Sequence, residues 1–154
     1  MKGNPKLLKT LNSLLADEMT AINQYVVHAE MCADWGYDKL HDHFEKRAID
    51  EMKHMGKLIE RILFLDGRPV VGNLNAIHIG AEVPKMFAND QAAEADAIKA
   101  YNNAIVQAGE VKDYATREIL EGVLQDEDRH MNEIEENLDQ IQQMGLANFL
   151  TGQV

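Results

Sequence analysis

The chain has 154 residues, 45% hydrophobic and 27% charged, which is long enough and apolar enough for one domain spanning residues 1–154. Its 26 acidic and 15 basic side chains leave a net charge of −11, which disfavours binding to the phosphates of nucleic acids. A single cysteine, Cys32, excludes a disulfide framework and a metal site built from four cysteines of one chain.

Four long segments have apolar residues at steps of three and four, the period of an α-helix with one buried face. Helices are expected at about residues 5–34, 38–65, 82–109 and 113–144, with a short terminal helix within residues 146–154. Gly36, Gly67, Pro69 and Gly145 separate them. No segment has the roughly 18 consecutive apolar residues of a membrane span, and the first residues lack a signal-peptide pattern. We therefore expect a protein of the reducing cytoplasm that binds no membrane.

Residues 67–81 have no helical period and contain three glycines and a proline. The second expected helix is about 42 Å long, and fifteen extended residues reach about 50 Å. This segment can therefore cross the whole length of a bundle, whereas a simple up-and-down bundle needs only a short loop here. The sequence predicts an all-α four-helix bundle with a long crossover between helices two and three and a short C-terminal fifth helix.

The motif Glu-x-x-His occurs twice, at residues 51–54 and 127–130, each time within a long expected helix. Side chains three positions apart share one face of a helix, so both can reach one metal ion. A glutamate precedes each motif by 33 residues, Glu18 before the first and Glu94 before the second. The whole pattern thus repeats after 76 residues, as a weak internal duplication.

In each expected hairpin the paired glutamates lie roughly 24 Å from the turn, close to the middle of the bundle. They interrupt apolar faces, where an unpaired carboxylate is costly unless a metal or a partner neutralises it. One Glu-x-x-His is common on a solvated helix face, but two copies with equally spaced glutamates favour a dinuclear site. Four carboxylates and two imidazoles suit iron first and manganese second, with zinc as an adventitious occupant. The candidate ligands are Glu18, Glu51, His54, Glu94, Glu127 and His130.

Five short stretches are typical of one known family: AINQY at 21–25, DWG at 34–36, IDEMKH at 49–54, ERILFLDG at 60–67 and MGLANFL at 144–150. In these stretches and the six candidate ligands the chain resembles the bacterioferritins, the haem-containing branch of the ferritin superfamily. The resemblance implies a ferritin-like bundle in which the six residues hold a di-iron ferroxidase centre. It also implies a hollow homo-oligomeric shell of 24 subunits that stores ferric mineral, a small ferredoxin as electron donor, and in some cases a second subunit type.

Met52 lies between two candidate ligands in the sequence, and about 100° per residue turns it away from their face. A thioether can bind haem iron, and a two-fold axis would supply a second Met52 from a neighbouring subunit. The resemblance implies a b-type haem between two subunits with Met52 as its axial ligand; the alternative is an apolar interface methionine. Residues of the first helix that could line this pocket are Met19, Ile22, Asn23 and Val26.

Tyr25 lies two helical turns after Glu18 on the same face, so it is expected near the metals. The resemblance implies that it supplies an electron or hydrogen-bonds a ligand; the alternative is a core tyrosine with a satisfied hydroxyl. The chain departs from the better-studied bacterioferritins at three positions, Lys46, Arg47 and Glu133, whereas Asp17 and Asp50 remain.

Several other polar residues are interpreted as non-ligands. Asp126 and Asp128 are expected to point away from the centre into solvent, and Cys32 is expected to be a small, partly buried side chain. Four histidines without a comparable carboxylate repeat are expected at the surface or at an interface: His28, His41, His43 and His78.

The leading hypothesis is an iron-storage ferroxidase that oxidises Fe2+ with O2 or peroxide and deposits ferric mineral. The alternative is a di-iron peroxidase or oxygenase of the rubrerythrin type without mineral storage. One cysteine is too few for a rubrerythrin with its own four-cysteine electron-transfer module. A third possibility is a helical assembly protein with a purely structural metal.

Overall fold

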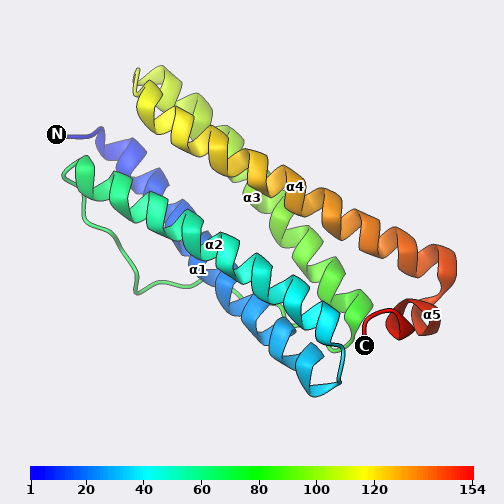
Figure 1. The fold of residues 1–154 in the computed structure, drawn as a ribbon. Coiled ribbons are helices and arrows are strands. Elements are labelled where there is room, and N and C mark those ends of the chain that lie inside the picture. Colours follow the sequence, from blue (N-terminus) through cyan, green and yellow to red (C-terminus); the bar gives the residue numbers. More distant parts are fainter.

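The computed structural model describes residues 1–154 and is all-helical, as predicted. Its helices are α1 (Pro5–Asp34), α2 (Asp38–Phe64), α3 (Val83–Glu110), α4 (Tyr114–Met144) and α5 (Leu146–Thr151). α1 pairs with α2 and α3 pairs with α4, and the two hairpins lie side by side (Figure 1). The bounds of the four long helices differ from the prediction by at most one residue. No helix combines the length and the apolar character needed to cross a membrane.

The segment between α2 and α3 runs along the outside of the first hairpin, which confirms the long crossover (Figure 1). It has no regular secondary structure, so its backbone N–H groups need other partners. Side chains on one face of α1 accept four of them at 2.8–3.1 Å: Asn12, Thr20, Gln24 and His28. This face of α1 therefore holds the crossover against the bundle.

His28 is fully buried, so its expected position at the surface or an interface is wrong. Its Nε2 accepts the N–H of Gly80 at 3.0 Å, which leaves the proton on Nδ1, 3.2 Å from the Asp90 carboxylate. Gln24 also donates to Asp90, at 2.8 Å. These partners lie more than 50 residues away from His28 in the sequence, so nothing local marks the histidine as buried. Of the other three, His78 is exposed, and His41 and His43 are partly exposed.

Gly80 fits tightly against the start of α3, because an added Cβ would lie 2.3 Å from the Met86 backbone nitrogen. We expect Gly80→Ala to lower the free energy of unfolding by about 1–3 kcal/mol, because the helix backbone cannot move aside easily. The control is Gly72→Ala in the same crossover, where an added Cβ meets nothing within 4 Å. It should change the free energy by less than about 0.5 kcal/mol. Urea unfolding at one protein concentration measures both, and equal stability of the two variants would contradict the prediction.

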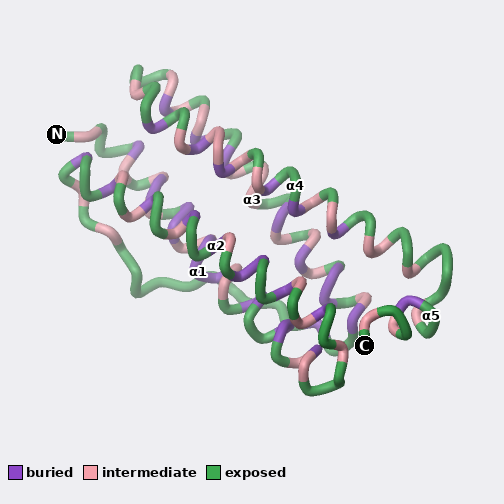
Figure 2. Tube along the Cα trace, in the orientation of Figure 1, coloured by how far each residue is buried: buried purple, intermediate pink, exposed green.

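The buried residues lie along the facing sides of the helices (Figure 2) and form two apolar clusters. One cluster includes Leu11 and Leu58; the other includes Phe44 and Phe87, which packs against Phe149 of α5. Cys32 is fully enclosed in the second cluster rather than partly buried. A layer of buried carboxylates and histidines remains outside both apolar clusters.

Candidate metal centre

The six predicted ligands meet in the middle of the bundle, and each is at most 3% exposed. They form two overlapping groups whose ligand atoms lie within 4.8 Å of one another. Glu18 and His54 belong only to the first group, and Glu94 and His130 only to the second. Each of the four long helices contributes one glutamate, and α2 and α4 add the histidines. Glu51 and Glu127 belong to both groups, so they occupy the positions from which a carboxylate can bridge two ions.

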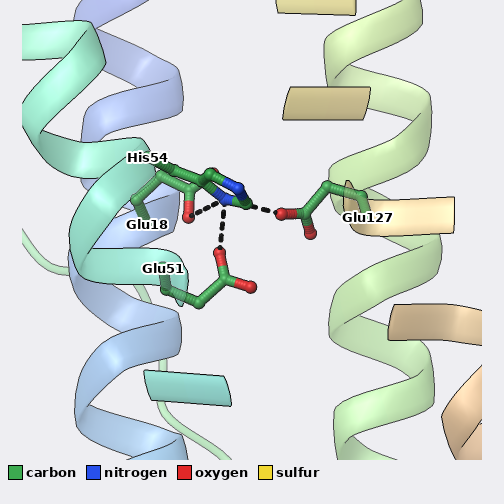
Figure 3. A group of neighbouring side chains, drawn as sticks. All are labelled: Glu18, Glu51, His54 and Glu127. Carbon is green, nitrogen blue, oxygen red and sulfur yellow. Dashed lines mark hydrogen bonds and ion pairs between the residues drawn. The ribbon is translucent and has the colours of Figure 1, made fainter. Parts of the chain in front are cut away.

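Both histidines turn the same ring nitrogen toward the carboxylates. Nδ1 of His54 lies 2.9 Å from Glu127 Oε1, 3.2 Å from Glu51 Oε2 and 3.7 Å from Glu18 Oε2 (Figure 3). Nδ1 of His130 lies 3.0 Å from Glu51 Oε1 and 3.4 Å from Glu94 Oε1. The two Nδ1 atoms are therefore the nitrogens placed to bind metal.

The outer nitrogen of each histidine is held by an aspartate. His54 Nε2 lies 2.8 Å from Asp126 Oδ2, and His130 Nε2 lies 3.1 Å from Asp50 Oδ2. An Nε2–H that donates to a carboxylate leaves the Nδ1 lone pair free for a metal and fixes the ring. The expectation that Asp126 points into solvent is therefore wrong, because α2 packs beside α4 and brings His54 within reach. Asp128 is exposed, as expected.

Glu18 and Glu94, the terminal glutamates that belong to one ligand group each, are both hydrogen-bonded by a tyrosine. Each tyrosine lies on the opposite helix of the pair α1 and α3. The Tyr25 hydroxyl donates to Glu94 Oε1 at 2.6 Å, and the Tyr101 hydroxyl donates to Glu18 Oε1. Tyr25 thus lies beside the centre, as predicted. Tyr101 was not among the predicted site residues, although it lies 76 residues after Tyr25. The internal repeat could have identified it, as it relates Asp50 to Asp126.

Without a cation, the centre is electrostatically unfavourable for four ionised carboxylates. Burial, reinforced by Glu18, raises the pKa of Glu51 well above its usual range. Burial and the neighbouring Glu127 likewise raise the pKa of Glu94. Seven buried side-chain atoms of the chain lack a hydrogen-bond partner, and five of them belong to Glu18, Glu51, Glu94, Glu127 and His130. Two divalent ions would neutralise the four carboxylates and give these atoms partners, so the residues fit a dinuclear metal centre.

A cavity of about 290 Å³ leads to the centre between α1, α3 and the crossover. It is lined by all four glutamates of the centre, but by neither histidine. Farther out, Asp17 and Asp96 line it, and Asp17 accepts a hydrogen bond from the Asn75 amide at 2.6 Å. Burial and the charge of Glu18 raise the pKa of Asp17. The cavity therefore has an acidic lining, which attracts cations.

Two of the three departures from the bacterioferritin pattern form one pair. The Arg47 guanidinium, only 3% exposed, binds the Glu133 carboxylate across α2 and α4. The two departing residues are therefore partners of each other in this structure. Lys46 is exposed.

Met52 lies on the outer side of α2 with half of its side chain exposed, so the expected outward orientation is confirmed. Asn23 and Val26 are also exposed, and Ile22 is half-buried. Met19 is 9% exposed and packs in the first apolar cluster, so its expected place on the outer side is wrong.

Four long helices around a buried layer of four glutamates and two histidines define a class of bundle proteins whose interior suits two metal ions. A family model described as a ferritin-like domain matches residues 8–144. The bacterioferritin of Mycolicibacterium paratuberculosis is 34% identical over 97% of this chain and 94% of its own. The bacterial ferritin of Synechocystis sp. is 36% identical over 100% and 99%, and the bacterioferritin of Rhodobacter capsulatus 36% over 97% and 92%. The chain belongs to the ferritin family, in its bacterioferritin branch.

Proposed function

We propose that this protein is an iron-storage ferroxidase of the cytoplasm. It oxidises Fe2+ at the centre formed by the six buried residues and deposits Fe3+ as mineral inside a homo-oligomeric shell of 24 subunits. The observation that carries the proposal is the duplicated ligand set in the middle of the bundle, in which five buried ligand atoms have no hydrogen-bond partner. Membership of the ferritin family supports the storage role.

The residues of the cavity and the centre have different roles toward the substrate, Fe2+. The acidic cavity admits the cation, and the four glutamates balance the charge of two Fe2+ ions, with Glu51 and Glu127 shared between them. Tyr25 and Tyr101 orient the two terminal glutamates by hydrogen bonds. Two Fe2+ ions supply the two electrons that reduce O2 to peroxide, or peroxide to water. We propose that Tyr25, whose hydroxyl donates to Glu94, can replace one Fe2+ as electron donor, and it would then lose its hydroxyl proton and become a tyrosyl radical.

We further propose a b-type haem on a two-fold axis between subunits, with Met52 of each chain as its axial ligand. The exposed thioether supports this, together with two further exposed apolar side chains, Ile49 three residues earlier on α2 and Val26 on α1. A small ferredoxin would then supply electrons for iron release, and a second subunit type could enter the shell.

The proposal is tested by adding Fe2+ to the purified protein under air and measuring particle mass by size-exclusion chromatography. We expect a particle of several hundred kilodaltons that oxidises two Fe2+ per chain quickly and then retains many more ferric ions. A small particle that consumes peroxide and retains no mineral would favour the rubrerythrin-like alternative. Absence of any Fe2+ oxidation would contradict both.

A further inference from the structure

The metal centre is nearly symmetric, and Arg129 is where the symmetry breaks. The 76-residue offset relates Asp50 to Asp126 and His54 to His130, and each aspartate holds the histidine of the other half. The same offset relates Arg129 to Lys53, which is exposed and lies in none of these contacts. Of these two related positions, only Arg129 brings a cation to the aspartates that hold the histidines.

One nitrogen of Arg129 contacts both aspartates. Nη2 lies 3.4 Å from Asp50 Oδ2 and 3.6 Å from Asp126 Oδ1. The Asp50 oxygen is the one that accepts from His130, and the other oxygen of Asp126 accepts from His54. A single guanidinium thus contacts the aspartate partners of both histidines, on the side of the centre away from the cavity lining.

Arg129 is itself held in place. Its Nη1 lies 3.3 Å from Glu133 Oε1, and Glu133 binds the buried Arg47. The guanidinium is consequently fixed from α4 by Glu133 and Asp126 and from α2 by Asp50, although 46% of the side chain is exposed.

We propose that Arg129 is a positioning residue shared by both halves of the metal centre, which holds Asp50 and Asp126 and through them the rings of His130 and His54. This inference rests on the proposed metal-binding function and adds to it a residue that contacts no ligand directly. Without Arg129, two neighbouring carboxylates lose their common cation and rotate apart. Both imidazoles then lose the fixed orientation that directs Nδ1 into the centre.

Removing Arg129 has two effects of opposite sign on metal binding. The loss of a positive charge favours a bound cation, but this charge is half-exposed and screened by solvent. The loss of histidine orientation weakens binding. A direct hydrogen-bond partner of a metal-bound histidine is worth about 10–100-fold in affinity, so a residue one step farther out should be worth about three- to tenfold. The orientation effect is therefore expected to dominate.

The test is a titration of the metal-free, assembled protein with Co2+, in which the visible absorption of the bound ion is measured at each addition. The parent should bind two Co2+ per chain. Arg129→Gln should raise the dissociation constants of both ions about three- to tenfold and alter the absorption bands, and Arg129→Lys should restore much of the affinity. Asp126→Asn and Asp50→Asn should each affect mainly one ion, the one bound by His54 and by His130 respectively.

Arg117→Gln is the matched control. Arg117 lies on the same helix, is 45% exposed and pairs with Glu121 four residues later, as Arg129 pairs with Glu133. It should leave both dissociation constants and the spectrum unchanged. Unchanged or tighter Co2+ binding by Arg129→Gln, or a change confined to one ion, would overturn the inference while leaving the proposed function intact. A parent protein that binds no Co2+ at the centre would overturn both.

Discussion

Replacing Glu127 with alanine should slow O2-dependent Fe2+ oxidation by roughly 100-fold or more. Loss of a residue that only hydrogen-bonds a metal ligand already lowers activity by about 10–100-fold, and Glu127 is a candidate ligand itself. Glu127 belongs to both ligand groups, so its loss affects both metal positions at once. Glu18→Ala removes a ligand from one group only and should also slow oxidation greatly, because two electrons require both ions. The measurement is the rise of ferric absorbance after protein loaded anaerobically with Fe2+ is mixed with aerated buffer.

These two variants should still fold and assemble. Each change removes a carboxylate that raises the pKa of Glu51, so the stability of the metal-free Glu127→Ala variant should stay equal or rise. In Glu18→Ala this relief is offset, because the Tyr101 hydroxyl loses its acceptor. Glu135→Ala, an exposed glutamate on the same helix as Glu127, is the control and should oxidise Fe2+ at the parent rate. Assembled Glu18→Ala and Glu127→Ala variants that also reach the parent rate would show that the six residues are not the ferroxidase centre.

Replacing Met52 with histidine should shift the Soret and α bands of the reduced, haem-reconstituted protein and lower its haem reduction potential. The reason is that the identity of the axial ligand sets both properties, and a methionine ligand favours the reduced iron more than an imidazole does. The spectrum of the reduced protein and a potentiometric titration measure the two effects.

Met144 provides the control for this substitution, since it is 44% exposed, close to the 50% of Met52, and lies at the end of α4. Met144→His should leave spectrum and potential unchanged. Full haem retention by Met52→His with an unaltered spectrum would identify Met52 as an apolar interface methionine instead.

Periodicity and breakers in the sequence were sufficient to place the helices, because one helix buries one face and Gly or Pro ends it. Residues 67–81 predicted the crossover from chain length alone. The six candidate ligand positions followed from the 76-residue repeat, since spacing along a helix determines which side chains share a face. Spacing also placed Met52 outside and Tyr25 inside.

Only the tertiary structure decided which side chains meet between helices. The position of Asp126 on its own helix predicted that its side chain points into solvent. Instead it contacts the ring of His54 on α2, which lies 72 residues away in the sequence. His28 was expected at the surface or at an interface, but it is buried and contacts Asp90 and Gly80. The pairing of Arg47 with Glu133 has the same cause. A helical period fixes the direction of a side chain relative to its own axis, whereas the rotation and height of the neighbouring helix determine which polar groups face it.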